Sequence, residues 1–267
     1  MPLNKSVGNM YDFDSERLGV GTMEWAEVTE NIQLGCVNNC RYCYAAYDAN
    51  RFGRRYRSDW LREELTKRAE MKSYPAKDGV IMFPSTHDIT PFNVEACLRV
   101  LRLMLEKRNR LLIVSKPRPE IIHHLCEQLE KYRKQILFRF TIGSTDDVTL
   151  KYWEPGAPCF GERISALEIA CAYEFRTSVS AEPLLGGRAM ALDLIERLDP
   201  LVSDTIWIGK LNKGRLRVWP MTDRTRSQLD EIEFMQNDKE MTQLVLEATG
   251  NPKVRWKDSI RMVVDAT

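Results

Sequence analysis

Short apolar runs alternate with amphipathic stretches of helical length along most of this 267-residue chain. This alternation is typical of a parallel sheet wrapped by helices. Six strands are expected, at 25–34, 79–83, 111–115, 136–143, 177–181 and 205–209. Helices are expected between them, at 59–72, 93–107, 120–134, 146–153, 162–174 and 188–198. Six such units suit a single barrel, in which the loops at the carboxyl ends of the strands carry the chemistry.

The pattern changes after the sixth expected strand. Residues 222–249 are predicted to form one charged helix, and a short tail follows at 253–267. We therefore expect an N-terminal extension over 1–24, a barrel over 25–212, and a C-terminal segment over 213–267 that packs on the barrel.

Charge and apolar content restrict where the protein acts and what it binds. The chain has 39 Lys and Arg against 38 Asp and Glu, so any affinity for phosphate has to come from local patches. No uncharged run exceeds the ten residues 31–40, which predicts that no helix spans a membrane and that no membrane is a partner. Asp12, Asp14 and Glu16 stand where a signal peptide needs apolar residues, so a cytoplasmic location with reduced thiols is expected.

Three of the seven cysteines, Cys36, Cys40 and Cys43, are crowded onto the loop that follows the first expected strand. Four thiolates would be needed to ligate every iron of a [4Fe–4S] cluster. A cluster held by three would leave one iron open to a small molecule that carries an amine and a carboxylate. Structural zinc is the alternative, but a closed zinc site needs a fourth ligand, and no further Cys or His pair is apparent in the sequence.

The spacing Cys36-x3-Cys40-x2-Cys43, with Tyr42 just before the last cysteine, resembles the signature motif of the radical SAM superfamily. The resemblance implies an α/β fold, a partial (β/α)6 barrel of the TIM type. It also implies that the cysteines bind a [4Fe–4S] cluster, that S-adenosylmethionine (SAM) occupies the open iron, and that Tyr42 lies against the adenine. Such enzymes cleave SAM reductively to a 5′-deoxyadenosyl radical, which takes hydrogen from a substrate. A reducing partner such as flavodoxin or ferredoxin is then expected.

Polar side chains follow each of the next five expected strands, at the strand ends where barrel enzymes bind their ligands. They are Thr86, His87 and Asp88 after the second strand, Lys116 after the third, Ser144 after the fourth, Glu182 after the fifth, and Lys210 and Asn212 after the sixth. We expect these residues to hold the cofactor and the substrate.

Two of these elements, Thr86-His-Asp88 and Ser115-Lys116, are similar to motifs of the spore photoproduct lyase and DNA repair photolyase branch of the superfamily. The run Glu154-Pro-Gly-Ala-Pro158, followed by Arg163, resembles another feature of this branch. The similarity covers about residues 30–212. A weaker four-residue similarity, in the N-terminal run Gly8-Asn-Met-Tyr11, is to partly phage-borne relatives.

By this resemblance Lys116 contacts the SAM carboxylate, and His87 and Ser144 lie near its methionine or ribose. A lysine offers three donors and a full charge to a carboxylate. Other interpretations stay open, namely Lys116 as a solvated loop residue and His87 as a structural residue bonded to its own loop. Asp88 would also serve to cap the following helix or to fix the loop. Glu182 would bind a hydroxyl or an amine, or else pair with a neighbouring arginine.

One position departs from the branch. Spore photoproduct lyases place a hydrogen-donating cysteine directly before the Thr-x-Asp element, where this chain has Ser85. A hydroxyl hydrogen is a much poorer radical donor than a thiol hydrogen. Repair of a thymine dimer by that route is therefore disfavoured.

Two basic segments with aromatic residues flank the expected opening of the barrel, 51–57 after the cysteines and 210–219 after the sixth strand. Guanidinium groups pair with phosphates, and aromatic rings stack on bases. We therefore expect a phosphate-bearing substrate or a strand of nucleic acid to bind there, through Arg54, Arg55, Lys210, Asn212 and Arg215. Ordinary solvated charge, partly neutralised by acidic residues of the following helix, is the alternative.

The sequence thus predicts a radical SAM enzyme whose substrate is a nucleic acid or nucleotide, or else a small metabolite or peptide. The competing prediction is a zinc-stabilised nucleic-acid-binding protein without turnover.

Overall fold

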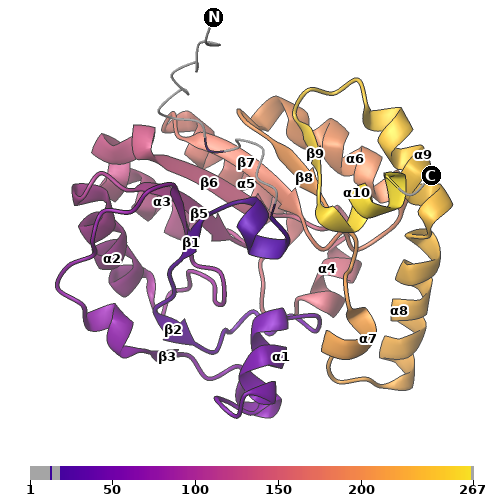
Figure 1. Cartoon of the computed structure of the whole chain (residues 1–267), viewed down its shortest axis with the longest axis horizontal. Helices are drawn as coiled ribbons and strands as arrows, with labels where there is room; N and C mark the ends of the chain where they lie inside the picture. Colours follow the sequence, from indigo (N-terminus) through magenta and orange to yellow (C-terminus); the bar gives the residue numbers. More distant parts are fainter. Residues whose placement is uncertain (1–12, 14–18, 266–267) are drawn as a thin grey trace, which may run out of the picture.

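The computed structural model describes residue 13 and residues 19–265. A parallel sheet of seven strands forms the centre of the molecule (Figure 1), in the order β1-β4-β5-β6-β7-β8-β9. The strands are β1 Val28–Thr29, β4 Val80–Phe83, β5 Arg110–Ser115, β6 Ile136–Thr141, β7 Arg176–Ala181, β8 Ile206–Ile208 and β9 Val254–Trp256. The expected α/β fold, a partial barrel of the TIM type, is confirmed, with one strand more than expected.

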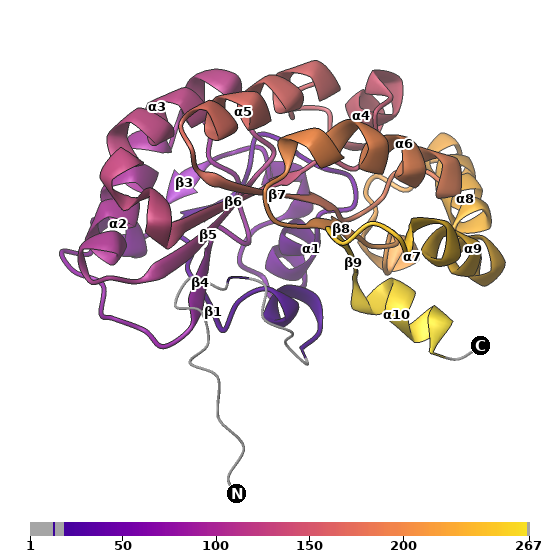
Figure 2. The same cartoon turned by 90° about the horizontal axis from the view of Figure 1, so that it is seen from above.

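Helices connect the strands and cover the convex side of the curved sheet, as Figure 2 shows. The main ones are α2 Val94–Glu106, α3 Pro119–Leu129, α5 Phe160–Ala172 and α6 Arg188–Leu198. Each turns an apolar stripe toward the strands; in α2, for example, Leu98, Leu101 and Leu105 are buried. Helices α2, α5 and α6 lie within two residues of their expected positions, whereas α3 ends five residues early and 130–135 continues as the 3-10 segment η4.

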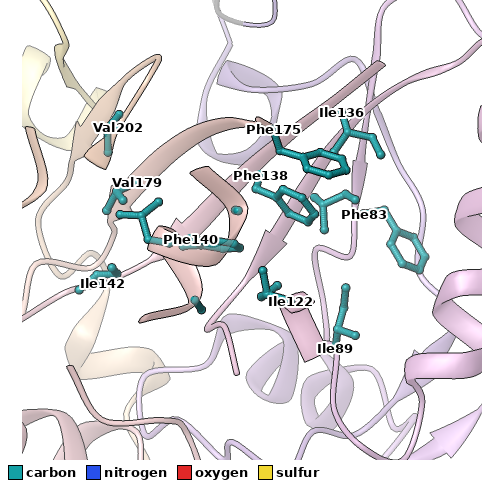
Figure 3. Close-up of a cluster of buried hydrophobic side chains, with 14 of the residues drawn as sticks. Phe83, Ile89, Ile122, Ile136, Phe138, Phe140, Ile142, Phe175, Val179 and Val202 are labelled. Carbon is teal, nitrogen blue, oxygen red and sulfur yellow. The ribbon is translucent and has the colours of Figure 1, made fainter. Parts of the chain in front are cut away.

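Because side chains alternate along the strands, the sheet has one apolar face and one partly polar face. In β6, Phe138 and Phe140 join the large apolar cluster drawn in Figure 3. Thr141 and its parallel neighbour Ser180 belong to the opposite, concave face, because adjacent paired residues point to the same side of a sheet. Burying the apolar face under helices therefore leaves polar side chains free to line a site on the concave side.

The helix expected over 59–72 is not formed. That segment consists of the 3-10 turns η2 Arg57–Asp59 and η3 Lys67–Glu70 and of the short strand β3 Glu64–Leu65, which pairs with β2 Gln33–Leu34. Leu61 and Leu65 of this segment are 51% and 39% exposed, so they form no buried stripe that would support a helix here. The helix that follows the cysteines is instead α1, Tyr44–Arg51.

The charged stretch 222–249 is two helices rather than one, α8 Asp223–Met235 and α9 Asp238–Ala248. Gln236 separates them, because its buried side chain donates to two backbone carbonyls of the loop that follows β7. Asn237 then caps α9 by accepting a backbone N–H through its side chain.

The tail contributes to the central sheet. Its strand β9 pairs with β8 in parallel, with Trp256 opposite Ile208, and α10 (Asp258–Val264) follows. A three-residue strand is too short for alternation to reveal it in a sequence. The seventh strand therefore comes from a segment that we expected only to pack on the barrel.

Part of the N-terminal analysis lies outside the described residues. This applies to Gly8–Tyr11, to Asp12, Asp14 and Glu16, and to most of the extension expected over 1–24. Within the described part of the chain, none of the helices combines the length and the apolarity needed to cross a lipid bilayer.

Candidate active site

A cavity of about 440 Å³ opens where the strands β4 to β8 end. Most of the predicted site residues line it: Cys36, Cys40, Tyr42, Cys43, Thr86, His87, Asp88, Lys116, Glu182, Lys210 and Asn212. The fold thus brings strand ends that are far apart in sequence to one space. Of the remaining predicted residues, Ser144, Arg54, Arg55 and Arg215 are not among its lining side chains.

The three cysteines all face this cavity from the loop between β2 and α1. Cys43 caps α1, since its Sγ accepts a hydrogen bond from a backbone N–H at 3.4 Å. Cys36 and Cys40 are each 8% exposed, and burial raises the pKa of Cys40 to about 12. Burial, Asp88 and the two other thiols raise the pKa of Cys36. The thiols of Cys40 and Cys43 are therefore close enough to Cys36 to oppose its ionisation.

The thiols fit an iron–sulfur cluster better than a single ion. Bound iron would offset their mutual repulsion, because a metal stabilises the thiolate that it binds. No group of three or more His, Cys, Asp or Glu side chains in the described part of the chain is arranged to hold a single metal ion. All three thiols border the cavity, which leaves room for the separate irons of a cluster. No other cysteine is among the described residues that line the cavity.

A buried charge network lies beside the cysteines. Glu154, directly after α4 (Asp147–Trp153), is 1% exposed and pairs with Arg163. Lys116 Nζ lies 3.7 Å from the same carboxylate, and the Tyr42 hydroxyl donates to it. Burial works to raise the pKa of Glu154, but Arg163, Lys116 and the hydrogen bond from Tyr42 lower it overall. One ionised carboxylate is thus shared by two cations, and Asp88 is a further carboxylate near Lys116.

Asp88 joins the ends of two strands to the cysteine loop. Its carboxylate accepts the backbone N–H of Ile89 at 2.8 Å and that of Lys116 at 3.0 Å. It also accepts hydrogen bonds from the side chains of Ser115 and Asn38. Four donors nearly fill the capacity of a carboxylate. Of the roles considered for this residue, fixing the loop is the one that its contacts support.

His87 is held by its surroundings through both ring nitrogens. Nε2 accepts the backbone N–H of Ile32 at 3.2 Å, so Nδ1 carries the proton and donates to the Asp88 carbonyl at 3.0 Å. Burial lowers the pKa of His87 to about 4. The ring is therefore neutral at physiological pH, and only its carbon edges and faces are open to a ligand in the cavity.

Glu182 lines the cavity directly after β7, with 27% of its side chain exposed. Its ionic partner is a lysine rather than the arginine considered from the sequence. Lys257, from the C-terminal tail, places Nζ 3.4 Å from Glu182 Oε2. Burial raises the pKa of Glu182, and Lys257 acts in the opposite direction.

The two basic segments contact each other, and of the two only 210–219 contributes residues to the cavity lining. The guanidinium carbon of Arg57 lies 5.0 Å from the ring centre of Trp219. Arg54 is exposed and lies over the ring of Phe52 at 5.8 Å. Lys210 lines the cavity with its Nζ 3.4 Å from Asp238, a carboxylate that is itself 75% exposed.

The side chains of two residues that were predicted to contact the substrate are instead paired with other residues of the protein. Arg55 pairs with Glu64 and donates to backbone carbonyls, and its side chain is 9% exposed. Arg215 forms ion pairs with Asp230 and Glu233 of α8. These contacts brace the segments internally instead of presenting a cation to a ligand.

Ser144 lies under the cavity wall rather than in it. It is fully buried, and its hydroxyl accepts the backbone N–H of Asp146 at 3.0 Å.

Two residues to which the sequence analysis assigned no role, Glu154 and Lys257, contact residues that line the cavity. Glu154 was noted only as part of a family feature, and Lys257 comes from a tail in which no local pattern marked it.

A family model described as the radical SAM superfamily matches residues 31–190, more than half of the chain. The chain belongs to the radical SAM superfamily. It is an enzyme of that superfamily, which implies an iron–sulfur cluster and SAM as cofactors. The prediction of a binding protein without turnover is therefore not supported. No curated protein sequence matches the chain.

Solved structures of spore photoproduct lyase share the fold of this radical SAM enzyme. One, in complex with a dinucleoside spore photoproduct, has a TM-score of 0.56 and 14% sequence identity, over 94% of this chain and 80% of that chain. A double mutant of the lyase with bound AdoMet and dinucleoside spore photoproduct has a TM-score of 0.53 and 14% identity, over the same shares of the two chains. The expected likeness to this branch is confirmed for the fold.

Proposed function

We propose that Cys36, Cys40 and Cys43 bind a [4Fe–4S] cluster and that SAM binds at its open iron. When bound, the cluster supplies the electron that cleaves SAM to methionine and a 5′-deoxyadenosyl radical, which takes hydrogen from the substrate. The observation that carries the proposal is the shared cavity, in which three thiols and a lysine border one space of about 440 Å³. This volume is typical of sites for small molecules and cofactors.

Lys116 is the proposed partner of the SAM carboxylate. Its side chain is 15% exposed and borders the cavity. Burial works to lower the pKa of Lys116, but Cys40 and Glu154 raise it overall, so the ammonium group stays charged. Glu154 is shared with Arg163, and Asp88 also lies near Lys116. A ligand carboxylate that enters the cavity would meet a charged hydrogen-bond donor.

Tyr42 is the proposed contact for the adenine. Its hydroxyl is held by Glu154, and Lys116 Nζ lies 5.7 Å from the ring centre. A ring anchored at its hydroxyl end has one orientation, which favours stacking against a flat base. Thr86 and His87 border the same cavity and are proposed to lie near the methionine or ribose. Ser144 is not proposed as a contact, because it lies behind the wall.

A nucleic acid or nucleotide is the substrate class that we propose. Three aromatic side chains of the two basic segments are exposed: Phe52 at 64%, Tyr56 at 75% and Trp219 at 42%. Arginines accompany them, as in surfaces that bind single strands through stacking and phosphate pairing. The structural likeness to a lyase solved with a dinucleoside supports the same class. Ser85 stands where those lyases carry a cysteine, so we propose a different route for the product radical, and with it a different reaction.

Anaerobic reconstitution tests the proposed cofactors. We expect about four irons and four sulfides per chain, and formation of 5′-deoxyadenosine that depends on a reductant such as flavodoxin or ferredoxin. Replacing Cys36, Cys40 or Cys43 by Ala should abolish both. Cys159→Ala is the matched control, because Cys159 is exposed and outside the cavity. One tightly bound zinc and no SAM cleavage would refute the proposal.

Deuterium transfer tests the substrate class. Labelled oligonucleotides, nucleotides, peptides and small metabolites would each be offered with SAM. Deuterium in 5′-deoxyadenosine from an oligonucleotide or nucleotide supports the proposed class. Transfer only from a peptide or a small metabolite assigns the enzyme to the competing class.

A further inference from the structure

Lys257 of the C-terminal tail is fully buried beside the cavity. Its Nζ pairs with the carboxylate of Glu24 and lies 3.4 Å from that of Glu182. It also donates to the Gly21 carbonyl at 2.7 Å and lies 4.1 Å from the ring centre of Trp25. Gly21, Trp25 and Glu182 all line the cavity. A residue from the end of the chain thus supports three parts of the wall.

Stability alone does not explain a charged group at this position. Removing an ammonium group from water costs several kcal/mol, and a buried ion pair often contributes no more than a well-packed apolar residue would. Here two carboxylates and a second cation, Arg261 at 2.7 Å from Glu24, are arranged around Lys257. The most exposed of the carboxylates that Lys257 contacts is Glu182, which faces the cavity.

Lys257 favours the form of the Glu182 carboxylate that accepts hydrogen bonds from a ligand. Burial raises the pKa of Glu182, and Lys257 opposes that shift, so the lysine favours the ionised carboxylate. An ionised carboxylate is an acceptor only, for a hydroxyl or an ammonium group. Lys257 approaches Oε2, and within the described residues no hydrogen bond to Oε1 is found. One oxygen is therefore held by the tail while the other is available to a ligand.

The same lysine connects the two edges of the open sheet. β9, which precedes Lys257, is one edge strand, and η1 (Gly21–Glu24) leads into β1, the other edge strand. Lys257 contacts Gly21 and Glu24 on one side and Glu182 on the other. The rim near Gly21 and the end of β7 therefore both depend on one ammonium group.

We infer that Lys257 is a positioning residue of the active site, which holds Glu182 and the rim at Gly21 in place to bind SAM. The inference rests on the proposed function, since it assigns the ligand of Glu182 as SAM. It makes the C-terminal tail a part of the active site rather than a covering segment.

The test measures SAM affinity calorimetrically on anaerobically reconstituted protein with equal iron content in every variant. Lys257→Met should weaken SAM binding by about tenfold or more, as expected for the loss of a charged hydrogen-bond partner. Glu182→Gln should weaken it similarly, and the loss in the double variant should be clearly smaller than the sum of the two single losses, because both variants act on the same carboxylate. Lys257→Arg, which keeps the charge, should recover part of the affinity.

Arg261→Met is the matched control. It also removes a cationic partner of Glu24 but has no ion pair with Glu182, so SAM affinity should stay within about twofold of the wild type. If Lys257→Met does not fold, Lys257→Gln replaces it, because it keeps a donor for the Gly21 carbonyl without the charge. Wild-type affinity in the lysine variant, or additive losses in the double variant, would overturn the inference. A wild-type protein that does not bind SAM would instead refute the proposed function.

Discussion

The ammonium group of Lys116 lies 3.7 Å from the carboxylate of Glu154, at the cavity wall formed by the cysteine loop. Lys116 follows β5, and Glu154 follows α4, so the pair joins two loops at the carboxyl side of the sheet. Arg163 is the second cation on the same carboxylate. Asp88 also lies near Lys116, so the two cations face two carboxylates. The ammonium group of Lys116 borders the cavity, where it can donate to the carboxylate of a ligand.

Lys116→Met should weaken SAM binding about tenfold to a hundredfold, because the ligand carboxylate would lose a charge-assisted hydrogen bond. Calorimetric titration of the reconstituted protein measures the affinity. Lys151→Met is the matched control, since Lys151 is an exposed lysine of α4 that donates to the Pro155 carbonyl. Equal affinities in the two variants would remove Lys116 from the proposed site.

Glu154→Gln should lower the free energy of unfolding by about 3–5 kcal/mol, because it leaves Arg163 and Lys116 without a buried counter-ion. Urea unfolding measures the change. The pKa of Glu154 is lowered in the folded protein from the ordinary 4.5, so its contribution is present above about pH 4.5 and is lost as the pH falls further. Glu130→Gln, which removes a surface pair 3.6 Å from Arg133, should change stability by less than about 1 kcal/mol. An unchanged free energy of unfolding in Glu154→Gln would contradict this account of the network.

His87 should make stability depend on pH in a defined range. Its pKa falls from 6.5 to about 4 on burial, so between these values the unfolded chain binds a proton that the folded chain does not. Stability is therefore lost as the pH falls from 6.5 to 4, by about 3 kcal/mol in total. His87→Gln should remove this part of the pH profile, whereas His124→Gln, on the surface, should leave it. The urea concentration at the midpoint of unfolding, determined from pH 4 to 7, measures this pH dependence. Parallel curves of stability against pH for the wild type and His87→Gln would exclude the effect.

The surface formed by the two basic segments, 51–57 and 210–219, should bind single-stranded oligonucleotides in a salt-dependent way. Arg51 and Arg54 are exposed and lie over Phe52, so each is free to contact a phosphate. Replacing either by Ala should reduce the slope of log affinity against log salt by about 0.7. Fluorescence anisotropy at several salt concentrations measures the slope. Arg215→Ala should leave it unchanged, because Asp230 and Glu233 already neutralise that arginine. An affinity independent of salt would rule out this surface.

Local pattern was enough to predict much of the fold. Helices such as α2 and α6 have an apolar stripe that the sequence shows directly, and buried strands such as β5 are short apolar runs. The stretch 59–72 was predicted wrongly as a helix, because an amphipathic helix is stable only if the fold buries its apolar face, and Leu61 and Leu65 are exposed. Pairing of β3 with β2, a contact made across the loop, decided its conformation instead.

For the site, the sequence by itself determined the cysteine motif, the aromatic Tyr42 within it and the polar residues at strand ends, because each depends on neighbours a few positions away. Only the tertiary structure decided the partners: Glu154 for Lys116, Asn38 for Asp88 and Lys257 for Glu182. Those contacts join segments that no local periodicity relates. Burial and the pairing of charges within one cavity are properties of the folded chain, so they appear only once the sheet has brought its strand ends together.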